Sequence, residues 1–102
     1  MADARDTNSA VRDDPARQRY ELRTPDGPAI AAYERDGDIL VLNHTTVPPA
    51  QEGRGVASRL IAGALADVRS RGLRIVPACA FVAAYLERHP VHRDLVAENA
   101  SG

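Results

Sequence analysis

The hydrophobic pattern of this chain changes once, at Pro48-Pro49, and that change limits what the chain can fold into. Before the two prolines, residues 19–23, 29–34 and 39–47 are short alternating or continuous apolar segments, which is typical of β-strands. The turn sequences Thr24-Pro25-Asp26-Gly27 and Asp36-Gly37 separate them. Residues 39–42 are apolar on both faces, so we expect this third strand to lie centrally in the sheet.

After the prolines the apolar residues recur at helical spacing, and the sequence predicts a helix through Val56, Leu60, Ile61, Ala64, Leu65 and Val68. Gly72 is well placed just beyond its end. Residues 73–76 predict a short strand, residues 81–86 a second helix that Pro90 ends, and residues 93–97 a last short strand. The order predicts an α/β fold: a compact mixed sheet with N-terminal antiparallel strands, then helix–strand–helix.

Length and charge exclude several classes of protein. A chain of 102 residues with net charge −1 is expected to form one domain, and it offers no electrostatic case for binding nucleic acid or an anionic membrane. The longest uncharged run, residues 75–86, is shorter than the roughly 20 residues that span a bilayer. One cysteine, no signal-peptide pattern and no metal-ligand cluster lead us to expect a cytoplasmic protein without a metal site.

The ends of the chain are polar and aperiodic. We expect residues 1–16 to form a disordered tail, residues 17–97 to form the domain, and residues 98–102 to be flexible.

The segment Glu52-Gly53-Arg54-Gly55-Val56-Ala57 lies between a strand and an amphipathic helix. The first N–H groups of a helix lack intrahelical partners, and glycines let a diphosphate approach them closely. No Ser, Thr, Asp or Asn stands at the cap position, so a phosphate-binding loop and a simple tight turn are equally good interpretations of these residues. All 13 basic residues are arginines, which excludes a lysine-containing phosphate loop.

Three segments together carry a family resemblance: His44-Thr45-Thr46-Val47-Pro48 through Ala57, Pro77-Ala78-Cys79-Ala80-Phe81-Val82, and Tyr85-Leu86-Glu87-Arg88-His89-Pro90. This pattern resembles the small single-domain branch of the Gcn-five-related N-acetyltransferases. The resemblance implies an acetyl-coenzyme A (acetyl-CoA) cofactor whose pyrophosphate is bound by Gly53, Arg54, Gly55, Val56, Ala57, Ser58 and Arg59. The chain departs from the family at Glu52, where Arg or Gln is usual, and at Thr46, where this branch commonly has Glu.

The same resemblance suggests three catalytic residues. Tyr85 stands where larger relatives have the tyrosine that protonates the coenzyme thiolate, although its spacing also suits core packing. Cys79 precedes a helix start, which lowers a thiol pKa, and is a candidate acyl acceptor or else a small buried residue. His44 is a candidate base for Cys79 or for the amine, or else a structural residue. His89 is interpreted as a helix-end cap and His92 as a surface residue.

The resemblance therefore implies an acetyl-CoA-dependent N-acetyltransferase that acts on an amine, with a protein as one candidate acceptor. Larger relatives insert helices between the first two strands, and these shape the acceptor pocket; here that interval is only the turn at residues 24–28, so we expect an open acceptor side. The alternatives are a non-catalytic acyl-CoA-binding module, favoured by Glu52 and Thr46, and an interaction domain that has lost the ligand.

Overall fold

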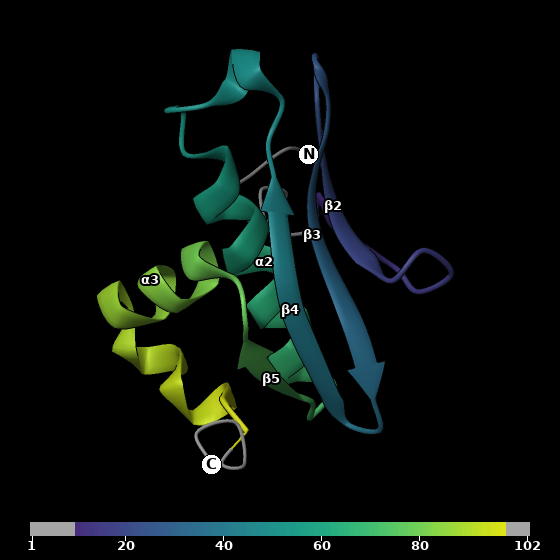
Figure 1. The fold of residues 1–102 in the computed structure, drawn as a ribbon, viewed down its shortest axis with the longest axis vertical. Coiled ribbons are helices and arrows are strands. Elements are labelled where there is room, and N and C mark those ends of the chain that lie inside the picture. Colours follow the sequence, from purple (N-terminus) through teal and green to yellow (C-terminus); the bar gives the residue numbers. More distant parts are fainter. Residues whose placement is uncertain (1–9, 98–102) are drawn as a thin grey trace, which may run out of the picture.

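A five-stranded sheet with two α-helices forms the molecule, as the computed structural model shows for residues 10–97 (Figure 1). In chain order the elements are β1 (Val11–Asp14), β2 (Arg19–Thr24), β3 (Gly27–Asp36), β4 (Ile39–Thr46), the 3-10 turn η1 (Pro49–Gln51), α2 (Val56–Ser70), β5 (Arg74–Pro77), α3 (Ala80–Arg88) and the 3-10 turn η2 (Pro90–Leu95). The sheet order is β1-β2-β3-β4-β5. The first three pairings are antiparallel and β4–β5 is parallel. The predicted mixed α/β fold is confirmed, including a β4 with neighbours on both sides.

Two predictions about the ends of the domain are wrong. Val11–Asp14, predicted within the disordered tail, is strand β1 and pairs with β2. The sequence hides it because β1 is mostly polar and is held by distant partners. Residues 93–95, predicted as part of a strand, belong to η2, and only Val96 bridges to Ile75. Residues 10, 15 and 16 of the predicted tail lie in turns. Its residues 1–9, and the predicted flexible C-terminus at residues 98–102, lie outside the described residues.

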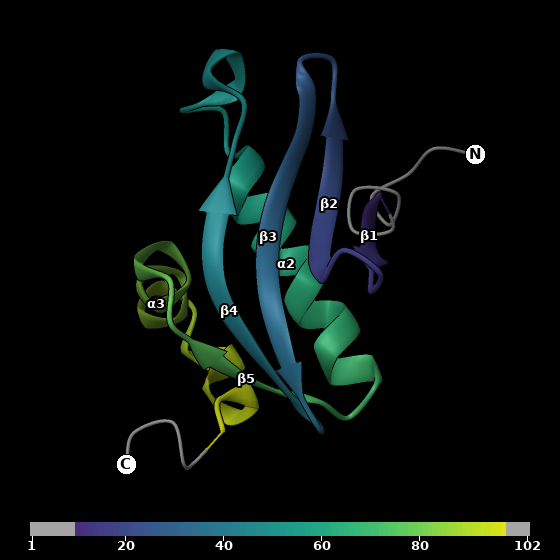
Figure 2. The same cartoon turned by 45° about the vertical axis from the view of Figure 1, so that its right-hand side comes forward.

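Both α-helices lie on the same side of the sheet. In Figure 2 the strands face the viewer and α2 runs behind them. Side chains alternate along β2 and β3, so that Tyr20, Leu22, Ala29, Ala31 and Tyr33 are buried towards α2. The same core contains residues of α2 and α3, among them Leu60, Ile61, Ala64, Leu65, Val68, Val82, Tyr85 and Leu86. Among residues 10–97, no helix is long and apolar enough to cross a membrane.

The opposite side of the sheet is uncovered in the described part of the chain, and we call it the open face. The register assigns to it the residues between the buried positions: Arg12 and Asp14 of β1, Arg19, Glu21 and Arg23 of β2, Pro28, Ile30 and Ala32 of β3, His44 and Thr46 of β4. Most of these side chains are exposed or half-buried. The β2–β3 connection is a tight turn, as predicted, and therefore contributes nothing that covers this face.

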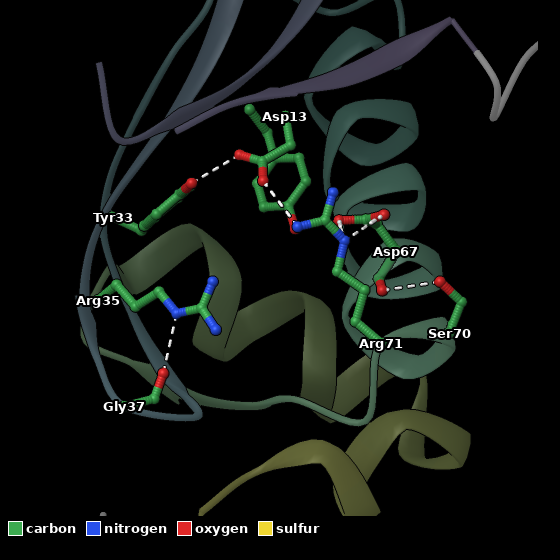
Figure 3. A network of polar contacts seen from close by, with 8 residues as sticks. Asp13, Tyr33, Arg35, Gly37, Asp67, Ser70 and Arg71 are labelled. Carbon is green, nitrogen blue, oxygen red and sulfur yellow. Dashed lines mark hydrogen bonds and ion pairs between the residues drawn. The ribbon is translucent and has the colours of Figure 1, made fainter. Parts of the chain in front are cut away.

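β1 is attached to the rest of the domain by a polar network (Figure 3). The Tyr33 hydroxyl donates a 2.6 Å hydrogen bond to Asp13, and the Tyr20 hydroxyl donates one of 2.6 Å to Asp67 of α2. The Arg71 guanidinium lies between the two carboxylates, 3.2 Å from each. These contacts join β1, β2, β3 and the end of α2 across most of the sequence.

An irregularity in β4 decides which side chains face the helices near the end of that strand. Leu42 pairs with Tyr33 but His44 pairs with the preceding residue, Ala32, so Asn43 is an extra residue on β4. Beyond this bulge, Thr45 pairs with buried Ala31 and shares its side of the sheet. His44 and Thr46 consequently project from the open face.

Candidate functional site

The loop before α2 presents backbone N–H groups without a protein cap. Gly53 and Gly55 have φ of 80° and 77°, left-handed conformations that glycine adopts readily. Gly55 is the N-cap of α2, no side chain caps the helix, and the Arg59 N–H makes the first helical bond, to the Gly55 carbonyl at 3.1 Å. The N–H groups of residues 56–58 therefore have no intrahelical acceptor and lie at the positive end of the helix dipole.

A groove of about 370 Å³ lies beside this helix start. Its lining residues are Val47, Gln51, Glu52, Gly53, Gly55, Val56, Ala57, Ser58 and Phe81. The groove thus joins the end of β4, the loop, the first turn of α2 and the first turn of α3. Phe81 is 37% exposed, which is unusual for so large an apolar side chain and gives the groove an apolar wall.

The groove contains most, but not all, of the predicted cofactor-binding residues. Gly53, Gly55 and residues 56–58 line it, whereas the exposed Arg54 and Arg59 do not. Sequence reasoning missed Val47, Gln51 and Phe81 as lining residues. Phe81 lies within the motif that carries the resemblance, but its helical spacing with Val82, Tyr85 and Leu86 is equally typical of core packing.

The groove suits a phosphorylated ligand with an apolar portion. Free main-chain donors and the helix dipole favour phosphate oxygens, and a Cβ at Gly53 or Gly55 would point into open space. Val47 and Phe81 offer apolar surface alongside. Glu52 is the unfavourable member of the lining, because its carboxylate repels a diphosphate unless it turns outward.

Cys79 is the N-cap of α3 and is held against the end of β4. Its N–H donates to the Leu42 carbonyl at 2.9 Å, and its Sγ lies 3.4 Å from Thr45 Oγ1. Burial raises the pKa of the Cys79 thiol, but the Thr45 hydroxyl and the nearby backbone N–H groups of Phe81 and Val82 favour the thiolate, and the net effect is a lowered pKa. The sulfur does not form a capping hydrogen bond to α3, so these N–H groups stabilise the thiolate through their electrostatic field.

Tyr85 is buried in α3, six residues beyond Cys79. Its ring centroid lies 4.2 Å from that of His89 and 6.2 Å from that of His92. Burial raises the pKa of Tyr85, so the phenol keeps its proton at neutral pH. The expectation that His92 is a surface residue is wrong: η2 folds back after Pro90 and half-buries it.

Within the described residues, His92 Nδ1 is buried without a hydrogen-bond partner. Burial, followed by the charge of Arg69, lowers the His92 pKa.

The structure does not bring the three candidate catalytic residues together. Cys79 contacts Thr45, whereas the exposed His44 projects from the open face of the same strand. Cys79, Tyr85 and His44 are all outside the groove lining. His44 is therefore placed to reach a molecule on the open face rather than to serve Cys79.

The fold and the glycine-containing groove define a class of protein that comparison with known sequences identifies. The profile described as GCN5-related N-acetyl-transferase matches residues 19–95, and the chain belongs to this family. The match begins at β2 and ends at η2, so it includes the loop, both α-helices and β5.

Several vertebrate proteins are similar to this chain. Protein NATD1 of Gallus gallus and that of Homo sapiens are each 35% identical over 68 residues, which is 66% of this chain. The matched region spans 62% of the chicken protein and 60% of the human protein. Protein NATD1 of Xenopus tropicalis is 31% identical over 100 residues, covering 93% of this chain and 92% of the frog protein.

Proposed function

We propose that this chain is an acetyl-CoA-dependent N-acetyltransferase of the cytoplasm. The observation that carries the proposal is the uncapped start of α2, which opens into a groove with one apolar wall. Family membership supports an acetyltransferase-like function, and the groove supplies a reason to expect the coenzyme in particular.

In this proposal the backbone of the loop holds the pyrophosphate. The N–H groups of residues 53 and 55–58 donate to phosphate oxygens, and Val47 and Phe81 contact the apolar arm of the coenzyme. Arg54 and Arg59 are exposed beside the loop and contribute charge from outside the groove. The bound coenzyme supplies an activated acetyl thioester.

The roles of Cys79, Tyr85 and His44 stay predictions. Cys79 has the thiolate character that an acyl acceptor needs, and Thr45 positions its sulfur. Tyr85 is protonated at neutral pH and is able to donate a proton to a departing thiolate. His44 faces the side of the sheet from which an amine has free access, where a base is required to accept its proton.

A non-catalytic acyl-CoA-binding module is the second candidate function. Two residues favour it. The carboxylate of Glu52 in the groove lining repels phosphate, and Thr46 at the end of β4 cannot act as a general base. Both functions require the same groove, so binding and turnover have to be measured separately.

The test compares two aspartate substitutions at left-handed glycines. Gly55→Asp places a carboxylate at the start of α2, and we expect it to weaken acetyl-CoA binding at least tenfold by calorimetry. Gly37→Asp is the matched control, because Gly37 has a similar φ of 62° but lies in the β3–β4 turn. We expect it to keep wild-type affinity.

Unchanged affinity in a folded Gly55→Asp protein would place the coenzyme elsewhere. Turnover of acetyl-CoA with a panel of amines then separates the two functions: coenzyme binding without acetyl transfer to any amine favours the binding module.

A further inference from the structure

The open face carries a concentration of arginine at one end, although the whole chain has a net charge of −1. Arg12, Arg19 and Arg23 project from β1 and β2 on this face. Arg19 is paired with Glu21, with 2.6 Å between Nε and Oε2. Asp14 also lies on this face, 3.6 Å from Arg17. No ion pair to Arg12 or Arg23 is formed by the described part of the chain, so these two arginines give this part of the face a local surplus of positive charge.

Two adjoining hollows lie between these side chains. The first, of about 490 Å³, is lined by Ala10, Arg12, Glu21 and Arg23. The second, of about 300 Å³, is lined by Glu21, Arg23, Thr24, Gly27 and Pro28. Because they share Glu21 and Arg23, they form one shallow depression from the edge strand to the β2–β3 turn. Its shape suits an extended chain better than an enclosed small molecule.

The strand register connects this depression to the end of β4. Arg12 pairs with Glu21, Glu21 with Ile30, and Ile30 with Thr46, so these four residues form one row across the open face. At about 4.8 Å between strands, Arg12 lies about 14 Å from Thr46 along the row. An extended peptide covers that distance in about four residues.

The depression is also close to the loop that precedes α2. Gln51 of η1, which lines the groove, donates a 2.6 Å hydrogen bond to Asp26 of the β2–β3 turn. That turn also forms part of the second hollow. The groove and the depression therefore share one end of the molecule and open on different sides of the sheet.

We propose that the Arg12–Arg23 depression on the open face docks an acidic segment of a polypeptide acceptor, about four residues from the amine that is acetylated. The proposal rests on the proposed transferase function for the role of the amine, and on charge complementarity for the docking. Arg12 and Arg23 pair with carboxylates of the acceptor, and Ile30 contacts the intervening residues on the way to the end of β4.

Binding is tested without any acetyl transfer, using two peptides that carry one lysine. Peptide one is Ac-Lys-Gly-Ala-Gly-Asp-Glu-Asp, and peptide two has three arginines in place of the acidic residues. We expect only peptide one to bind, more weakly as salt rises. The variant Arg12→Glu/Arg23→Glu should bind peptide one at least tenfold more weakly, a loss of about 1.4 kcal/mol. The same variant should bind peptide two. Arg88→Glu/Arg93→Glu is the matched control, since both arginines are exposed on α3 and η2.

Turnover with the same peptides distinguishes the two proposals. Binding of the acidic peptide without acetyl transfer to any amine would contradict the proposed transferase function and support the docking surface. Acetyl transfer with the same KM for both peptides would overturn the docking proposal and keep the transferase.

Two other results would also overturn the docking proposal. One is tighter binding of an oligonucleotide than of the acidic peptide, which would assign the face to nucleic acid. The other is a dimer in sedimentation that the double Arg→Glu variant dissociates, which would assign the face to a second copy of the chain.

Discussion

Gly63 is the residue of α2 against which β1 packs most closely. It lies in the middle of α2, where glycine is ordinarily unfavourable by about 1 kcal/mol relative to alanine. A Cβ at this position would come within 2.5 Å of Val11 Cγ2 and 2.6 Å of Val11 Cβ. The missing side chain thus lets the edge strand lie directly on the helix.

We expect Gly63→Ala to destabilise the protein by about 1–2 kcal/mol in urea unfolding, because the overlap with Val11 outweighs the gain in helix propensity. In a Val11→Gly background, which removes the overlapping side chain, the same substitution should be neutral or stabilising. Equal effects of Gly63→Ala in both backgrounds would show that contact with β1 is not the reason for glycine at this position.

At the scale of elements, the junction between β4 and α3 decides the chemistry of the only cysteine. The bulge at Asn43 turns Thr45 towards the helices, and the Cys79 N–H donates to the Leu42 carbonyl beside it. The thiol is therefore placed by three segments: the end of β4, the end of β5 and the start of α3. A single cysteine in a sequence carries no sign of this arrangement.

We expect Thr45→Val to raise the pKa of the Cys79 thiol, because the substitution removes a hydroxyl that favours the thiolate and keeps a side chain of similar size. The pH dependence of iodoacetamide alkylation measures this directly: its midpoint should move to higher pH. Thr46→Val is the matched control, since Thr46 projects from the open face. A midpoint that moves equally in both variants would show that the Thr45 hydroxyl does not specifically stabilise the Cys79 thiolate.

At the scale of the whole molecule, the tyrosine–aspartate network joins three strands to the far end of α2, and it gives the protein a particular response to alkali. Burial, followed by the hydrogen bonds to Asp67 and Asp13, raises the pKa values of Tyr20 and Tyr33 well above 10. A pKa that is higher in the folded than in the unfolded protein stabilises the fold below pH 10 and ceases to do so as the pH rises.

We therefore expect the free energy of unfolding to fall above pH 10, by about 1–2 kcal/mol at pH 11 after allowance for solvent screening at the tyrosine hydroxyls. The chain has no lysine that would titrate in the same range, so the loss is assignable to tyrosine. Tyr20→Phe/Tyr33→Phe should be less stable at pH 7 and should lose less on going to pH 11. An equally steep loss in this variant would contradict the assignment to the network.

The sequence by itself determined the local elements and the glycine-containing loop before α2. Alternating apolar residues, the turn at Asp36-Gly37 and the stripe from Val56 to Val68 each specify structure through neighbours a few residues away, and each is found where expected. The two glycines of the loop and the missing cap residue likewise indicated a helix start with free N–H groups.

Only the tertiary structure decided which side chains meet across the sheet. β1 was missed because Val11 and Asp13 are held by Gly63, Tyr33 and Arg71, all distant in sequence. His44 and Thr45, as neighbours in a strand, lie on opposite sides of the sheet in any register. The extra residue in β4 decides which of the two faces the helices, so that Thr45 rather than His44 contacts Cys79. Periodicity reports the faces of an isolated element, whereas register and helix packing depend on the summed contacts of the whole core.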